Sequence, residues 1–528
     1  MKIPAIAATT NRKLSAMSEV LRIFLFTFVI GLASHGFAYS NTTFGHDALY
    51  LYTADFALGM TWSRKLFEMF RGFLLMPWVI GLFTLVIVSL ICFSLVRLLN
   101  VRHWPAQLLL VGIMVTYPAM TAFHNFFADL FTWSLLLSVW SVTLASRKGW
   151  VSWAGSIVLL TVSIGNYAAF ISMAAALMVI VLLRDVLLGD GNLKPIILKG
   201  LKFLAILAIS IALYVAIFSL IHAIEGNPAI TEYRGKDQML SIQPHLIPRW
   251  VRAAYIHVLK CLFAVNYLPA FSSWGGYPLW VRVLLFISII VITGRMAVQL
   301  FRNGFFKKPL HIALCAVLLG LLPLAMNAIM VLERGKIPHG LMTYAYIAPF
   351  LLVIQYGEQL HEASARELHP KGKWLNVMLS AVCAACMALT GYYGFIAANA
   401  NHLAFKLDYD ASISLATRIM DRVQTTEGYT LETPVWFAGN IAGNPDANPR
   451  EGFVQYYTSG QGQAMSFDQC TEWFMKFILS SGMNIIGSQP ELDEAQVKVV
   501  KQLPTFPAMD CYTWIDNVLV FRVGKSWD

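Results

Sequence analysis

The sequence predicts a polytopic α-helical membrane protein of about eleven transmembrane helices, followed by a small C-terminal soluble domain of α/β type. Of its 528 residues, 57% are hydrophobic and only 13% are charged, whereas soluble proteins carry about 25% charged residues. Apolar runs long enough to cross a bilayer recur along the chain, and basic residues gather in alternate connections. This composition excludes an ordinary soluble enzyme, a disordered chain and a nucleic-acid binder with a basic surface.

The first part of the chain, residues 1–396, is the predicted membrane domain. Its first span is interpreted as an uncleaved helix, although basic residues before a short apolar core also suit a signal peptide. The segments 151–165 and 167–183 are short, and one long helix broken at Gly165-Asn166 is the alternative. The expected spans are 22–39, 74–95, 106–122, 127–145, 151–165, 167–183, 201–223, 277–295, 309–331, 340–357 and 374–396.

Lysine and arginine predict the orientation, because short basic loops remain in the cytoplasm. Arg97 and Arg102 lie in one such loop, and Arg147 and Lys148 lie in the next one on the same side. The N-terminus is therefore expected in the cytoplasm and the domain after residue 396 in the periplasm. The net charge of +10 is thus mainly a topology signal, and no nucleic-acid partner is needed to explain it.

The C-terminal domain, residues 397–528, has strand-like runs at 434–438 and 517–522. Cys470 and Cys511 would face an oxidising compartment, where they form either a disulfide or two separate thiols. No group of His, Asp or Glu has metal-ligand spacing and no glycine-rich phosphate loop is present, so we expect neither a metal site nor a nucleotide cofactor.

Polar residues gather outside the membrane, in the loops 40–73, 224–276 and 332–339, while the middles of the spans are almost free of charge. A transporter would place ionisable residues inside its spans. The pattern favours an enzyme that works at the membrane boundary.

The first external loop contains the residues best suited to catalysis. A carboxylate near the headgroups, Asp47 or Asp55, can deprotonate a sugar hydroxyl, and Arg64 and Lys65 can neutralise a lipid phosphate. His46 stands beside Asp47. The alternative is an ordinary solvated loop that holds a short amphipathic helix.

Cations also mark the later external segments. Arg249 and Arg252 would share one face of an amphipathic helix in the headgroup plane, which serves either as a membrane anchor or as a ledge for a donor phosphate. Arg334 and Lys336 lie in a turn that also suits a phosphate, unless Glu333 and Arg334 form a structural pair. The candidate substrate-binding residues are His46, Asp129, Tyr167, Glu333 and His339, although Asp129 also suits a helix first turn.

Several short motifs together resemble a known family, the serotype-conversion O-antigen glucosyltransferases of bacteria and their phages. The motifs are Gly59 with Arg64, Asp129, Gly165-Asn-Tyr167, Leu503-Pro-Thr-Phe-Pro507 and Ile515-Asp-Asn-Val-Leu-Val-Phe521.

The resemblance implies a GT-C-type membrane glycosyltransferase of the bacterial inner membrane. Such an enzyme takes glucose from undecaprenyl-phosphate-glucose and adds it to lipid-linked O-antigen, so a donor synthase and a flippase are expected functional partners. The family's first-loop acidic residues map onto Asp47, and its basic residue after the glycine maps onto Arg64. A tandem acidic pair is common in the family, whereas this chain has His46-Asp47, which leaves Asp55 as the other candidate base.

The expected reaction is direct displacement at the anomeric carbon, with no cofactor beyond the lipid-linked donor. The alternatives are another polyprenyl-phosphate-sugar-dependent transferase, a flippase for a lipid-linked saccharide and an O-antigen polymerase.

Overall fold

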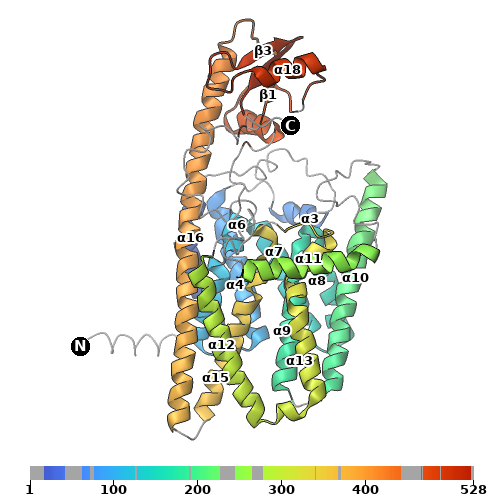
Figure 1. The fold of residues 1–528 in the computed structure, drawn as a ribbon, viewed down its shortest axis with the longest axis vertical. Coiled ribbons are helices and arrows are strands. Elements are labelled where there is room, and N and C mark those ends of the chain that lie inside the picture. The colour runs from blue at the N-terminus through green and yellow to red at the C-terminus, as the bar shows by residue number, and fades with distance from the viewer. Residues whose placement is uncertain are drawn as a thin grey trace, which may run out of the picture. The chain divides into compact units, whose positions relative to one another are not determined.

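The computed structural model describes residues 17–41, 62–71, 76–124, 128–189, 192–225, 244–263, 277–338, 340–366, 370–439, 441, 465, 468–487 and 489–524. Most of the described backbone up to Gln424 is helical, and a small sheet follows it (Figure 1). The chain divides into two compact units, and the boundary between them falls within the long helix α16, between Asn399 and Ala400.

The helices of the membrane unit follow one another through short connections. In chain order they are α2 (Glu19–Ser40), α3 (Trp62–Arg71), α4 (Pro77–Leu99), α5 (Trp104–Thr116), α6 (Pro118–His124), α7 (Ala128–Ala145), α8 (Trp150–Asn166), α9 (Ile171–Leu188), α10 (Leu193–Glu225), α11 (Ile247–Phe263), α12 (Leu279–Arg302), α13 (Pro309–Met326), α14 (Ala328–Leu332), α15 (Ala348–Arg366) and α16 (Pro370–Gln424).

Within the described residues, eight helices are long and apolar enough to cross a membrane, and α5 with α6 makes a ninth if the bent pair is one span. The prediction of a polytopic helical membrane protein is confirmed, and eight or nine of the roughly eleven predicted spans meet this criterion of length and composition. The segment 151–165 forms α8, which has only 17 residues. The segment 340–357 begins with two 3₁₀ turns, and α15 then carries polar residues such as Gln355 and Glu358.

Two helix breaks shape the membrane unit. α5 and α6 meet at an angle of 51°, because Tyr117 is extended and precedes Pro118. α8 ends at Asn166, after which Tyr167 is extended and a 3₁₀ turn, η2 (Ala168–Phe170), leads into α9. The sequence 151–183 therefore forms two helices rather than one.

Serine pairs hold α7 against α8. Ser134 and Ser163 each donate a hydroxyl to the other's backbone carbonyl at 2.8 Å, and Ser141 and Ser156 do the same at 2.9 Å. Small side chains permit this close approach, and hydrogen bonds between helices are a usual source of cohesion in membranes. The pairs fix the end of α8 relative to the beginning of α7.

The C-terminal unit contains a four-stranded sheet in the order β2-β1-β4-β3. β1 (Pro434–Ala438) pairs in parallel with β2 (Asn484–Ile485) and with β4 (Val518–Arg522), and β3 (Tyr512–Ile515) pairs antiparallel with β4. The predicted strands 434–438 and 517–522 correspond to β1 and β4. The expectation of a small mixed α/β fold is therefore confirmed.

The sheet has a hydrophobic core on each face. Phe437 and Phe521 belong to the larger core, together with Leu415 of α16 and Phe474. The smaller core contains Val500 of the helix α18 (Glu494–Gln502) and the strand residues Trp436, Ala438, Ile515 and Val520.

The structure describes the side chain of Cys511 but not that of Cys470, the two cysteines of the predicted disulfide. Cys511 is a buried free thiol, and burial raises its pKa. Cys470 lies in α17 (Asp468–Trp473), but its side chain is not described. The pairing of these two cysteines stays a prediction.

Candidate active site

The basic connections of the membrane unit meet at one end of the helices. The guanidinium of Arg184, at the end of α9, donates to the carbonyl of Leu98 at 2.6 Å. The ammonium of Lys202, in α10, donates to the carbonyl of Arg147 at 2.9 Å. Residues that the sequence assigned to one side of the membrane therefore contact one another.

The opposite end brings Asp129 and Tyr167 together. Asp129 is only 1% exposed and lies in the first turn of α7, where its carboxylate accepts the N–H of Leu130 at 3.0 Å. The amide of Asn166, at the end of α8, donates to the carbonyl of Leu130 at 2.9 Å. Tyr167 packs edge-on against Phe131 with ring centres 4.8 Å apart.

The first-turn position of Asp129 matches the structural alternative considered for it, because an acidic group there interacts favourably with the helix dipole.

Tyr167 also connects this region to α14. It packs on a buried cluster that includes Ala169, Ile329 and Met342. The backbone N–H of Ile329 donates to the hydroxyl of Ser172 at 3.0 Å. Since α14 leads directly into Glu333 and Arg334, the turn predicted to bind phosphate begins beside Tyr167.

The turn after α14 is tightly built. Arg334 and Gly335 have positive φ angles of 55° and 81°, and the N–H of Gly335 donates to the carbonyl of Met330 at 2.7 Å. A glycine suits this position because its backbone conformation strains other residues. Glu333 is 3% exposed, Arg334 is half-buried and Lys336 is exposed. The turn therefore presents its cations rather than its carboxylate.

The surface helix α11 runs crosswise to α9, α10 and α13 (Figure 1). One of its faces is anchored: Trp250 is buried, and the hydroxyl of Tyr255 donates to the carbonyl of Gly320 at 2.7 Å. Arg249 and Arg252 are both exposed. The predicted amphipathic helix that carries Arg249 and Arg252 on one face is therefore present as α11.

The turn and α11 contact each other. The guanidinium carbon of Arg334 lies 5.9 Å from the ring centre of Trp250, a distance typical of a cation–π interaction. A Cβ added to Gly335 would lie 3.3 Å from the Trp250 ring. Arg249 and Arg252 are exposed on another face of the same helix, so α11 carries two predicted phosphate ligands and the turn packed on it carries a third.

A buried histidine fixes the middle of α11. His257 is 2% exposed, and its Nδ1 lies 2.8 Å from the hydroxyl of Tyr346. Burial, with a smaller contribution from Lys260, lowers the pKa of His257 to about 4. At neutral pH this imidazole is therefore uncharged.

Helix α3 is attached to the same end of α8. The hydroxyl of Ser63 donates to the carbonyl of Val162 at 2.7 Å. A Cβ added to Gly165 would lie 2.5 Å from the Trp62 ring, so the close packing of α3 requires glycine there. Arg64 and Lys65 lie on α3, although their side chains are outside the description.

One polar group was not proposed as part of the site. Because Nδ1 of His124 donates to the carbonyl of Met120 at 2.9 Å, its Nε2 accepts the hydroxyl of Tyr39 at 2.8 Å. The rings of His124 and His35 stack with their centres 3.9 Å apart. The only sequence signal for this group is that His124 ends the helix after the bend at Pro118. That position does not show that Tyr39 and His35 of α2 are its partners.

Four predicted site residues lie outside the described residues: His46, Asp47, Asp55 and His339.

A family model, described as glucosyl transferase GtrII, matches residues 59–354, which is more than half of the 528 residues. The matched segment includes Gly59, Arg64, Asp129 and Tyr167 and ends before the C-terminal motifs. Asp47 and Asp55 precede it. No curated protein and no solved structure matched the chain. The chain belongs to the glucosyl transferase GtrII family, the serotype-conversion O-antigen glucosyltransferases.

Proposed function

We propose that this glucosyltransferase transfers glucose from undecaprenyl-phosphate-glucose to lipid-linked O-antigen, at the periplasmic face of the bacterial inner membrane. Family membership implies glucosylation of O-antigen. The packing of the Arg334 turn on α11, the helix that exposes Arg249 and Arg252, is the observation that best supports the lipid-phosphate donor.

The orientation follows from the basic end of the membrane unit. At that end Arg184 donates to the carbonyl of Leu98 and Lys202 donates to the carbonyl of Arg147, and short basic loops remain in the cytoplasm. The opposite end, with α11 and the turn after α14, then faces the periplasm. The N-terminus is cytoplasmic and the C-terminal domain is periplasmic in this arrangement.

The cations would stabilise the leaving group. When the anomeric C–O bond breaks, undecaprenyl phosphate departs with the bonding electrons, and its negative charge develops beside arginine. Arg334 is held by the Trp250 ring, while Arg249 and Arg252 remain exposed on α11. Arg64, Lys65 and Lys336 are the further phosphate ligands of this proposal. An amphipathic helix in the headgroup plane places such cations at the depth of a lipid phosphate.

The acceptor would be activated by a carboxylate of the first external loop. Asp47 takes the proton from an acceptor hydroxyl while that oxygen forms the new bond to the anomeric carbon, and Asp55 is the alternative base. Tyr167 is half-buried beside the turn after α14 and offers a ring face to a sugar. Asp129, Glu333, His46 and His339 complete the proposed substrate-binding set.

A reconstituted assay tests the donor. The purified full-length protein is incubated with lipid-linked O-antigen and either undecaprenyl-phosphate-[¹⁴C]glucose or UDP-[¹⁴C]glucose. The proposal predicts label in the saccharide from the lipid donor alone. Labelling from UDP-glucose in the absence of any polyprenyl carrier would overturn it.

A further inference from the structure

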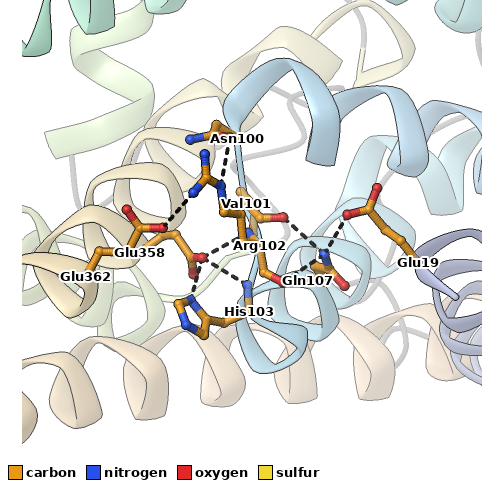
Figure 2. A network of polar contacts seen from close by, with 8 residues as sticks. All are labelled: Glu19, Asn100, Val101, Arg102, His103, Gln107, Glu358 and Glu362. Carbon is orange, nitrogen blue, oxygen red and sulfur yellow. Dashed lines mark hydrogen bonds and ion pairs between the residues drawn. The ribbon is translucent and has the colours of Figure 1, made fainter. Parts of the chain in front are cut away.

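The connection between α4 and α5, at the basic end of the membrane unit, is held by one buried carboxylate of α15. Glu358 is only 4% exposed. Its Oε1 accepts the backbone N–H of Arg102 at 2.8 Å, the backbone N–H of His103 at 2.9 Å and Nδ1 of His103 at 2.7 Å (Figure 2). One oxygen therefore satisfies three donors.

This hydrogen bond places Nδ1 of His103 beside the carboxylate of Glu358, with the two atoms 2.7 Å apart. A carboxylate only accepts hydrogen bonds, so Nδ1 carries a proton here. The tautomer with its proton on Nε2 instead leaves a lone pair on Nδ1, which then faces the carboxylate of Glu358. A divalent ion that replaces the Nδ1 proton would be held by both side chains.

A second carboxylate completes the group. Glu362 lies one helical turn beyond Glu358, and one ligand atom from each of His103, Glu358 and Glu362 falls within 4.8 Å of the others. Ligand atoms around a tetrahedral zinc ion lie about 3.4 Å apart, so modest side-chain rotations would close the site. The rings of His103 and His361 meet edge-on at 4.9 Å, which places a second imidazole nearby.

Charge and space also suit a cation. Glu358 and Glu362 contribute two negative charges, and Arg102 offsets only part of them, at 3.7 Å from Glu362. A cavity of about 150 Å³ adjoins the group and is lined by His103, Glu358 and His361. This volume can hold an ion with its bound water.

We propose that His103, Glu358 and Glu362 bind a zinc-class divalent ion that clamps the α4–α5 connection to α15. The mixture of imidazole and carboxylate favours zinc over magnesium or calcium, which prefer oxygen ligands alone. The site lies at the end of the helices opposite to the proposed active site, so its function is separate from sugar transfer. The sequence did not suggest it, because His103 and Glu358 are 255 residues apart.

If Glu358 only capped the connection, Oε1 alone would be sufficient and Glu362 would serve only as the ion-pair partner of Arg102. The two interpretations therefore differ in what Glu362 contributes, and zinc binding distinguishes them.

The test uses the full-length protein, purified with a histidine-free tag and stripped of metal by a chelator. Zn²⁺ is titrated by calorimetry, and Co²⁺ is used as a spectroscopic probe of the ligands. We expect one Zn²⁺ per chain, a loss of affinity of at least tenfold in Glu362→Gln and a larger loss in His103→Asn. The matched control is His245→Asn, an exposed histidine elsewhere in the membrane unit, which should bind like the wild type.

Zn²⁺ should also raise the unfolding temperature of the wild type but not of Glu362→Gln, because a ligand stabilises only the state that binds it. Because Glu362 is partly exposed, Glu362→Gln is expected to fold. This variant therefore tests zinc binding even if His103→Asn does not fold. No Zn²⁺ binding by the wild type, or equal affinity in Glu362→Gln, would overturn the proposal.

Discussion

The guanidinium of Arg334 lies over the ring of Trp250, 5.9 Å from its centre. This contact joins the turn after α14 to the surface helix α11, two segments separated by more than 80 residues. Trp250 is buried, while Arg249 and Arg252 are exposed on another face of α11. The aromatic ring therefore joins the turn of Arg334 to the helix that carries the other two cations.

Removing the charge of Arg334 should slow transfer. We expect Arg334→Gln to lower kcat/KM for the lipid donor by about tenfold to a hundredfold, since hydrogen bonds to charged groups are worth about 1.5–3 kcal/mol. Arg334→Lys should recover part of the loss because it restores a positive charge. Lys308→Gln makes the same charge change at an exposed position at the basic end and should have no effect. An unaltered rate in Arg334→Gln would remove this residue from the site.

A methyl group at Gly165 should displace α3. The added Cβ would lie 2.5 Å from the Trp62 ring, and overpacking of this kind costs about 1–3 kcal/mol. We expect Gly165→Ala to lower both the unfolding temperature and the glucosylation of O-antigen. Gly112→Ala is the control, because its Cβ would meet nothing within 4 Å. Recovery in the double variant Gly165→Ala/Trp62→Leu would confirm the cause, and equal behaviour of the two alanine variants would refute it.

The sequence predicted the features that depend on local pattern. Apolar length identified most of the helices, and strand-like apolar runs between turn-rich segments identified β1 and β4. Two predicted spans differ from the expectation in their helices, because apolar length alone could not show that α8 has only 17 residues or that 340–357 begins with 3₁₀ turns.

Contacts between segments far apart in the chain could not be predicted from the sequence. The cations Arg249 and Arg334 were each named, but only the fold places Trp250 between them. The group of His103 and Glu358 was missed for the same reason, since its ligands come from separate helices. Spacing reveals a site only when its residues share one element.

The buried histidine of α11 should make stability depend on pH. The pKa of His257 is about 4 in the folded protein and about 6.5 in an unfolded chain. The unfolded state therefore binds more protons between these values, and the stabilisation is complete above pH 6.5 and is lost as the pH falls towards 4. The slope from this one group is at most about 1.4 kcal/mol per pH unit.

The measurement is the unfolding temperature of the wild type and of His257→Gln between pH 4.5 and 7.5. The difference between the two proteins should shrink as the pH falls, because the variant lacks the titrating group. A difference that stays constant over this range would contradict the low pKa of His257.

The hydroxyl of Tyr39 should stabilise the external end of α2. It donates to Nε2 of His124, and Tyr39→Phe leaves that nitrogen without this donor, which costs about 1–3 kcal/mol for a buried group. Tyr255→Phe removes a hydrogen bond of similar length to the carbonyl of Gly320 from an exposed site and should cost less. Chemical unfolding of both variants provides the comparison, and a smaller loss in Tyr39→Phe than in Tyr255→Phe would be inconsistent with this account.

The central claim is that this chain transfers glucose to O-antigen with Asp47 as the base. Linkage analysis of O-antigen tests it most directly, in host cells that express the donor synthase and flippase with the wild-type chain, with Asp47→Asn or with neither. The account predicts a side-branch glucose with the wild type that falls by about 10²–10⁴-fold in rate with Asp47→Asn, at equal amounts of protein in the membrane. A branch that survives in Asp47→Asn would contradict the choice of base and favour Asp55, and no new branch with the wild type would contradict the proposed transfer itself.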